Sequence, residues 1–130
     1  MIQENIKIKE FTDLFAWQEA HKLVCMVYTA TNKFPKEEMF GLISQMRRAA
    51  ASITANIAEG FGRQGCKEKI QFFYLAQGSL TELKDQIFIA RDIQYCNSDV
   101  VENLLAQTTH THRLLQGLIT KTKSFLNPES

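Results

Sequence analysis

Ionisable and amide side chains recur at regular intervals in one stretch of the sequence, QMRRAAASITANIAEGFGR, which spans residues 45–63. Each residue of an α-helix turns the chain by about 100°, so positions three and four apart share a face. If the stretch is helical, its polar residues form one narrow row. Such groups could transfer protons, contact nucleic acid or pair with a neighbouring helix. The row comprises Gln45, Arg48, Ser52, Asn56, Glu59 and Arg63.

A second polar edge follows the break GRQGC, along residues 68–82. If the two segments form a helical hairpin that turns at residues 64–66, facing residues have numbers that add to nearly the same value. This register pairs Arg63 with Glu68, Glu59 with Gln71 and Arg48 with Glu82, and it places Ser52 opposite Gly78, where two backbones could approach closely. The hypothesis is a structural polar network of Arg48, Asn56, Glu59, Arg63, Glu68, Gln71 and Glu82.

No pattern of residues matches catalysis or metal binding. General acid–base catalysis needs titratable groups that converge in a cleft, whereas Glu59 and Glu82 already have expected partners. His110 and His112 lie on different helix faces, because neighbours on one face are three or four apart. The Glu-x-x-His pattern of di-iron bundles does not occur. We therefore expect a non-enzymatic protein with no catalytic residue, metal ligand or cofactor, and we interpret His21 as a core or interface residue.

The composition is that of an ordinary globular protein, with 45% hydrophobic residues, 22% charged residues and a net charge of +1. Cys25, Cys66 and Cys96 are widely spaced and form no Cys-x-x-Cys pair, which is typical of reduced thiols in a cytoplasmic protein. The N-terminal stretch MIQENIKIKEF lacks the apolar core of a signal peptide. No apolar run approaches the roughly 20 residues that span a bilayer. We expect a cytoplasmic protein with no membrane contact and no evident small-molecule substrate.

Four helices have to position the polar row, because apolar residues recur three and four apart along nearly the whole chain. The expected helices span about residues 13–33, 36–62, 67–94 and 98–126, with Thr12 or Asp13 capping the first and Ser98 capping the last. Pro35 and the glycines of GRQGC separate the first three. Short connections make consecutive helices antiparallel. The sequence predicts one all-α domain, residues 1–130, folded as an up-down-up-down antiparallel four-helix bundle.

Each expected helix has an inward stripe at helical spacing. From the N-terminus to the C-terminus, the four stripes are Leu14, Trp17, His21, Val24, Tyr28 and Thr31; Leu42, Met46, Ala49, Ile53 and Ile57; Phe73, Ala76, Leu80, Leu83, Ile87 and Ala90; and Val101, Leu104, Leu105, Thr108, Leu115, Leu118, Ile119, Thr122 and Phe125.

The motif RRAA-SI--NIAEG-GR followed by GSL-EL, with WQEAHKLV before it and IARDIQY after it, resembles a family of bacterial four-helix-bundle proteins. The family is associated with intervening sequences of 23S ribosomal RNA genes. The resemblance is close over about residues 11–95. It implies an up-down bundle that assembles into a ring, commonly a pentamer. It also extends to the accessory protein of diversity-generating retroelements, which partners a reverse transcriptase and nucleic acid.

Two positions depart from the usual pattern of this family. Gln77 stands before GSL, where a basic residue is frequent, and this weakens a strongly basic RNA-contact interpretation. In RDIQYCN, the residue before the tyrosine is Gln94, where the family often has a glycine.

Two surfaces could mediate binding. The small residues of the second helix and outward apolar residues of the third are typical of an oligomer interface, made of Ala51, Ala55, Ala58, Ile70, Tyr74 and Phe88. Basic residues that could contact nucleic acid are Arg47, Lys67, Lys69, Lys84 and Arg91. Arg47 has no place in the hairpin register, so we expect it to face a partner. The expected function is a pentameric scaffold that binds RNA or a reverse-transcriptase-like protein. The alternative is a protein–protein adaptor with no nucleic-acid contact.

Overall fold

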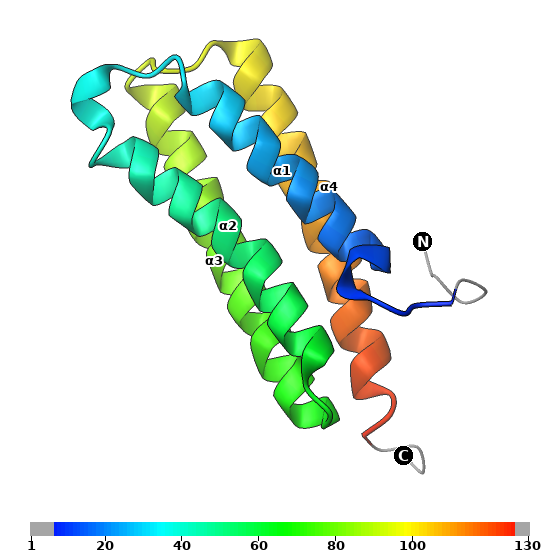
Figure 1. Ribbon diagram of the computed structural model, residues 1–130. Helices are drawn as coiled ribbons and strands as arrows, with labels where there is room; N and C mark the ends of the chain where they lie inside the picture. Colours follow the sequence, from blue (N-terminus) through cyan, green and yellow to red (C-terminus); the bar gives the residue numbers. More distant parts are fainter. Residues whose placement is uncertain (1–6, 127–130) are drawn as a thin grey trace.

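The computed structural model describes residues 7–126, in which four long helices pack side by side (Figure 1). The helices are α1 (Phe15–Thr31), α2 (Leu42–Gly62), α3 (Cys66–Asp92) and α4 (Ser98–Lys123). Two short 3-10 helices, η1 (Phe11–Asp13) and η2 (Lys36–Glu38), precede α1 and α2. α2 packs against α1 and α3, and α4 packs against α3 and α1, so the helices surround one core in chain order. The predicted all-α four-helix bundle is confirmed.

The long axis of the bundle divides it into two halves (Figure 1). The terminal half contains residues 7–22, 53–78 and 111–126, and both ends of the described chain lie in it. The η2 half contains residues 23–52 and 79–110, including η2 and the α3–α4 turn. These two names are used below for the position of each site.

α1 begins two residues later than predicted, and its predicted cap has another role. The Asp13 carboxylate accepts hydrogen bonds from the backbone N–H groups of Glu10 and Lys9, both at 3.0 Å, and so binds the chain before α1. These hydrogen bonds hold the pKa of Asp13 below its usual value, because they favour the ionised carboxylate. Leu14 therefore stands at the N-cap of α1 without a side-chain cap.

The predicted helix 36–62 is interrupted, because η2 ends at Glu38 and a turn precedes α2. The Glu38 carboxylate then accepts a hydrogen bond from the backbone N–H of Leu42 at 3.2 Å. At α4 the cap is Asn97 rather than the predicted Ser98, since Asn97 Oδ1 accepts from the N–H of Val100 at 2.9 Å. At the starts of α2 and α4, a side chain that precedes the helix thus accepts a hydrogen bond from a backbone N–H of the first turn.

α3 ends in a left-handed residue. Gln94 has a φ of 67°, and the N–H of Tyr95 donates to the carbonyl of Ala90 at 2.9 Å. This arrangement satisfies the last carbonyls of a helix, and it favours glycine at the left-handed position. Gln94, which stands where the family often has a glycine, therefore has a backbone conformation that is strained for a residue with a side chain.

The inward stripes of α2 and α3 agree closely with the prediction. All six predicted residues of α3 are buried, as are four of the five on α2, where Leu42 is half-buried. On α4, Val101, Leu104, Leu115 and Ile119 are buried, but Phe125 is 65% exposed rather than inward. The inner faces of the long uninterrupted helices α2 and α3 could be predicted from the sequence, because large apolar residues recur on them at helical spacing.

The predicted stripe of α1 is wrong over most of its length. Leu14 and Thr31 are buried as predicted, but His21 and Tyr28 are exposed and Trp17 and Val24 are half-buried. The other buried residues of α1 are Ala16, Ala20, Leu23, Val27 and Ala30. Alanines permit a close approach of α1 to its neighbours, so the helix buries three alanines together with Leu23 and Val27 and leaves the aromatic side chains of Trp17 and Tyr28 at the rim. His21 stacks on Trp17 with 4.8 Å between ring centroids, and it is not a core residue.

A close approach of α2 and α3 occurs at Gly60 and not at Gly78. A Cβ atom at Gly60 would lie 2.7 Å from Cε1 of Phe73 and 3.0 Å from Cβ of Phe72. A Cβ atom at Gly78 would have no atom within 4 Å, so the predicted approach there is wrong. Gly60 lets the buried Phe73 ring lie directly against the α2 backbone.

Candidate functional site

The polar row of α2 faces α3 at its Arg48 level, where the hairpin register expected an ion pair. Arg48 Nη2 lies 2.5 Å from Glu82 Oε2, and Glu82 also accepts a hydrogen bond from Gln86 at 3.2 Å. The side chains of Arg48 and Glu82 are 62% and 41% exposed. An exposed pair contributes about 0–1 kcal/mol, so this contact fixes the helix register more than it stabilises the fold.

The middle of the row is one residue out of the expected register. Ser52 Oγ lies 2.8 Å from Ser79 Oγ on α3, so Ser79 and not Gly78 faces it. Asn56 remains within α2, where its amide nitrogen donates to the carbonyl of Ser52 at 2.8 Å and to Ser52 Oγ at 3.1 Å. These hydroxyl and amide groups therefore satisfy one another, and no ligand is needed to pair them.

Near the α2–α3 turn the row forms a small ion cluster. Arg63 lies 3.2 Å from Glu59 on its own helix and 3.7 Å from Glu68 on α3, and its guanidinium stacks over the Phe72 ring at 4.7 Å. The expected pairing of Glu59 with Gln71 does not form, because Glu59 turns to Arg63 and Gln71 is exposed. The row as a whole joins α2 to α3, with its titratable groups paired and mostly exposed.

A further polar cluster joins α1 to α4, and sequence reasoning did not find it. Gln107 donates to the carbonyl of Glu19 at 2.8 Å and to its carboxylate at 3.2 Å, while His110 Nε2 lies 3.5 Å from the same carboxylate. Lys22 lies 2.8 Å from Glu19, and its hydrogen bond is the main cause that lowers the pKa of Glu19. Partners 88 residues apart along the chain leave no local sequence signal.

Arg47 makes contacts within the chain that the hairpin register did not include. Its Nε donates to Thr31 Oγ1 at 2.9 Å and its Nη2 to Asn32 Oδ1 at 3.0 Å. Its guanidinium also lies over the Tyr28 ring at 4.5 Å from the centroid. Arg47 thus attaches α2 to the C-terminal end of α1, where a cation is favourable to the helix dipole.

Two more of the predicted nucleic-acid residues have contacts within the chain. Lys69 Nζ donates to the carbonyl of Phe61 at 2.7 Å and so satisfies the C-terminal end of α2. Arg91 binds Asp92 at 2.7 Å and lies over the Phe88 ring at 4.8 Å. The hydrogen bond from Arg91 lowers the pKa of Asp92.

The five predicted nucleic-acid residues do not form one surface. Lys67 and Lys69 lie in the terminal half, while Arg47, Lys84 and Arg91 lie in the η2 half. Lys67 and Lys84 are exposed.

Charge is distributed unevenly between the two halves of the described chain. The terminal half has nine cations, Lys7, Lys9, Lys22, Arg63, Lys67, Lys69, Arg113, Lys121 and Lys123, and five carboxylates, Glu10, Asp13, Glu19, Glu59 and Glu68. The η2 half has six cations, Lys33, Lys36, Arg47, Arg48, Lys84 and Arg91, and seven carboxylates, Glu37, Glu38, Glu82, Asp85, Asp92, Asp99 and Glu102. A nearly neutral chain is therefore basic in its terminal half.

The predicted oligomer interface is partly corrected by burial. Ile70 is only 8% exposed and so belongs to the bundle interior, while Phe88 is half-buried beneath Arg91. Tyr74 is 43% exposed, Ala51 and Ala55 are exposed, and Ala58 is half-buried.

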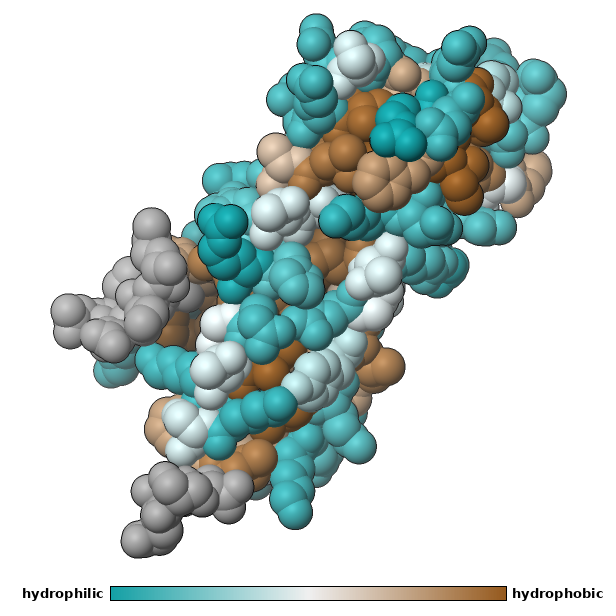
Figure 2. Space-filling model, turned by 180° about the vertical axis from the view of Figure 1, so that it is seen from behind, coloured by the Kyte–Doolittle hydropathy of each residue, from teal (hydrophilic) through white to brown (hydrophobic). Residues whose placement is uncertain are grey.

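Large apolar residues that the prediction omitted are exposed on α3, directly after α3 and before α2. They are Leu75 at 56%, Ile89 at 43%, Ile93 at 47%, Met39 at 46% and Phe40 at 95%. Viewed from behind, apolar surface gathers toward the η2 end of the molecule (Figure 2).

Groups that could perform nucleophilic chemistry are poorly arranged for it in the described chain. Cys25 Sγ lies 3.9 Å from His21 Nε2, and both side chains are exposed on α1. Cys25 and Cys96 line a pocket of about 380 Å³ in the η2 half, where burial raises the pKa of the Cys96 thiol. A raised thiol pKa opposes the thiolate that a nucleophile needs.

Residues 7–126 contain no group of three or more His, Cys, Asp or Glu side chains placed to hold a metal ion. Within the same residues, no helix has both the length and the apolar character needed to cross a membrane.

Fold and surface together define a class: a helical bundle whose polar groups join its own helices and whose exposed cations and apolar residues are available for binding. The chain matches the family model described as 23S rRNA-intervening sequence protein over residues 12–117, and it belongs to that family. The resemblance seen in the motif of residues 47–63 is thereby confirmed.

The fold is similar to a solved structure of a protein with unknown function from the S23 ribosomal protein family of Bacteroides thetaiotaomicron VPI-5482. The TM-score is 0.75 at 19% identity, and the match covers 84% of this chain and 98% of that chain. No curated protein matches the sequence. Neither comparison indicates an enzyme family.

Proposed function

We propose that this protein is a non-enzymatic scaffold that assembles into a ring, such as a pentamer, and binds RNA through its terminal half. The observation that carries the proposal is the uneven charge: nine cations and five carboxylates in one half, against six and seven in the other. The family description, which refers to 23S rRNA, supports RNA as the nucleic acid.

RNA phosphates would bind the exposed lysines of the terminal half. Lys7, Lys67 and Lys123 are exposed there and come from three different segments of the chain. Each phosphate contact releases a counterion, so affinity of this kind falls steeply with salt. In a ring, each basic half would be repeated in every copy, and the local field would rise well above that of one chain with net charge +1.

Self-association is supported by apolar side chains that the bundle does not bury. Leu75 and Ile89 lie on the outer side of α3, and Ala51 and Ala55 are exposed on the neighbouring helix α2. Small residues beside large apolar ones let two helical surfaces approach closely and exclude water. We place the contact between copies on this α2–α3 face.

The RNA-binding part is tested with two charge-matched triple variants. Lys7, Lys67 and Lys123 are changed to Gln in one, and Lys33, Lys36 and Lys84 are changed to Gln in the other. Fluorescence anisotropy with a labelled RNA hairpin from a 23S intervening sequence should show at least tenfold weaker binding for the first and a change below threefold for the second. Equal losses would contradict binding by the terminal half.

The ring is tested by sedimentation velocity at micromolar concentration. The native chain should sediment as an oligomer, Leu75→Glu should shift it toward the monomer, and Ala106→Glu on the exposed side of α4 should leave it unchanged. A monomeric native chain would refute self-association. Binding to a protein partner that ignores salt, with no RNA binding, would favour the adaptor alternative.

A further inference from the structure

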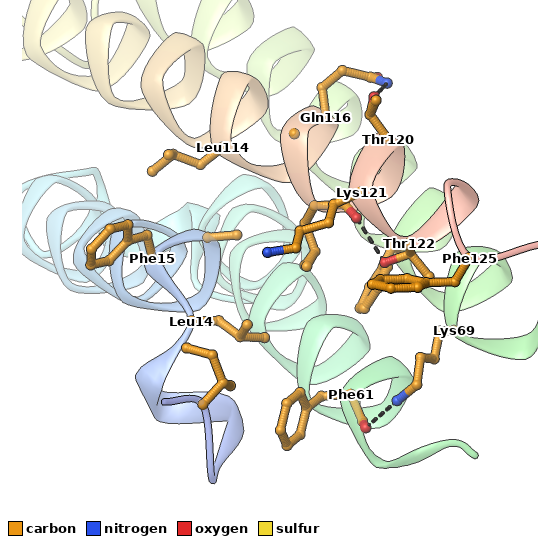
Figure 3. Close-up of a pocket in the computed structure, with 15 residues that line it drawn as sticks. Leu14, Phe15, Phe61, Lys69, Leu114, Gln116, Thr120, Lys121, Thr122 and Phe125 are labelled. Atoms are coloured by element: carbon orange, nitrogen blue, oxygen red, sulfur yellow. Dashed lines mark hydrogen bonds between the residues drawn. The ribbon is translucent and has the colours of Figure 1, made fainter. Parts of the chain in front are cut away.

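An apolar pocket lies in the terminal half of the described chain (Figure 3). It has a volume of about 640 Å³, which lies within the range of about 300–1,000 Å³ found for small-molecule sites. Its walls come from the segment before α1, from the first turns of α1 and α3, and from the C-terminal parts of α2 and α4. They are formed chiefly by Ile8, Leu14, Phe61, Leu114, Leu118 and Phe125.

Two lysines line this pocket, the half-buried Lys69 and the solvent-exposed Lys121. The Lys121 side chain points into the space beside Leu14 and Phe15 (Figure 3), and its ammonium makes no hydrogen bond or ion pair with the described residues. Lys121 stands in a stripe of α4 in which Leu114, Leu118 and Phe125 are apolar. A lysine at that position adds a cation to an otherwise apolar wall of α4.

The other polar side chains of the pocket are already satisfied. Lys69 donates to the carbonyl of Phe61 at 2.7 Å, and Thr122 Oγ1 donates to the carbonyl of Leu118 at 2.7 Å. Gln116 accepts a hydrogen bond from Gln77 at 2.8 Å on the outer side of α4. Lys69 keeps its positive charge, because a backbone carbonyl does not neutralise an ammonium, but it is held at the C-terminal end of α2. Lys121 is therefore the cation of the lining whose ammonium donors are available to a ligand, and these groups offer no free acceptor.

This chemistry selects one class of ligand. A nucleobase needs paired donors and acceptors along its edge, and the pocket does not supply them. An alkyl chain is satisfied by the apolar walls, and an anionic head at one end is satisfied by the Lys121 ammonium. No acidic residue lines the pocket, so nothing there opposes an anion.

We propose that the pocket binds a long-chain fatty carboxylate, with the alkyl chain among the walls of α1, α2 and α4 and the carboxylate on Lys121. This site lies in the same half of the bundle as the proposed RNA-binding lysines, but it is argued from the pocket alone and its test uses no RNA. Its ligand would enter beside Gly117, which lines the pocket and is exposed.

Isothermal titration calorimetry of the full chain with octanoate, decanoate and dodecanoate, each below its micelle concentration, tests the proposal. Because each buried methylene contributes about 0.8 kcal/mol, affinity should rise roughly three- to fourfold per added carbon. Lys121→Gln should weaken dodecanoate binding about tenfold and leave dodecanol binding unchanged. Lys123→Gln removes the same charge two residues away and should change neither, since Lys123 lies over the Tyr74 ring.

A second variant fills the pocket without harming the fold. A Cβ atom at Gly117 would have no atom within 4 Å, and leucine is a better helix former than glycine, so Gly117→Leu should fold at least as well as the native chain. It should reduce dodecanoate affinity at least tenfold.

Three outcomes would overturn the proposal. The first is no binding of dodecanoate, or binding that Lys121→Gln and Lys123→Gln weaken equally. The second is binding to anionic phospholipid vesicles without binding to dodecanoate monomers, which would assign the surface to a membrane. The third is dodecanoate binding that occurs only after dilution has dissociated the oligomer. That result would mean that a second copy of the chain fills the pocket in the oligomer.

Discussion

Replacing Gly60 by alanine tests whether a single missing methyl group lets α2 and α3 pack as they do. The new Cβ would lie 2.7 Å from Cε1 and 3.0 Å from Cδ1 of Phe73. Carbon atoms attract best at about 3.5–4.0 Å, so the overlap is roughly 0.8 Å. Phe73 is 2% exposed and part of the core, so its ring cannot turn outward to relieve the contact.

Two opposing effects set the size of the change in stability. Overpacking of a filled core costs about 1–3 kcal/mol, while alanine is a better helix former than glycine by about 1 kcal/mol. The propensity term also acts in Gly62→Ala and Gly78→Ala, where a Cβ atom would have no atom within 4 Å. We expect these two controls to gain up to about 1 kcal/mol, and Gly60→Ala to fall below them by about 1–3 kcal/mol.

Chemical denaturation at one fixed protein concentration measures these differences, and thermal melting should separate the variants by about 3–5 °C per kcal/mol. Gly62→Ala is the closer control, because it lies two residues from Gly60 in the last turn of the same helix. If Gly60→Ala were as stable as Gly62→Ala and Gly78→Ala, the close approach at Gly60 would be refuted.

Three further changes test the local geometry. Gln94→Gly should gain about 0.5–1 kcal/mol by releasing the left-handed residue with φ of 67°, whereas Gln94→Ala should gain nothing in the same denaturation assay. The Tyr95 hydroxyl donates a hydrogen bond to the Glu38 carboxylate at 2.9 Å, and this bond raises the pKa of Tyr95 in the folded chain. The hydrogen bond therefore stabilises the fold below pH 10, and its contribution is lost as the pH rises through the folded pKa. The stability difference between native and Tyr95→Phe chains should therefore shrink from pH 9 to pH 11, and a difference that grows would contradict it. A double-mutant cycle of Arg48→Ala and Glu82→Ala should give a coupling of about 0–1 kcal/mol that declines with salt, and a coupling above 3 kcal/mol would mean a buried pair.

The sequence predicted the architecture well because α2, α3 and α4 are long and carry large apolar residues at helical spacing. It failed on α1, where Ala16, Ala20 and Ala30 share the inner face with Leu23 and Val27. The large residues Trp17 and Tyr28 lie at the rim of that helix. Hydrophobic spacing favours large residues, and a close helix contact favours small ones. The two criteria disagree on the same helix.

The site was predictable only where neighbouring helices run in register. The contact of Arg48 with Glu82 follows from an antiparallel hairpin, and the structure contains it. The contacts of Arg47 and Lys69 within the chain were not predicted, because their acceptors, Asn32 and the carbonyl of Phe61, lie at helix ends whose position no periodicity reveals. The pocket around Lys121 requires several chain segments to meet, so nothing in one helix indicates it.

The salt dependence of RNA binding tests the central claim most directly. Affinity of the native chain for a 23S intervening-sequence hairpin should fall linearly in a double-logarithmic plot against salt, because lysines of the terminal half replace counterions on phosphates. Replacing Lys7, Lys67 and Lys123 by Gln should reduce the slope by about 2–3, while the same change at Lys33, Lys36 and Lys84 should leave it unaltered. A slope that does not respond to the first set, or equal responses to both, would contradict RNA binding by this half of the bundle.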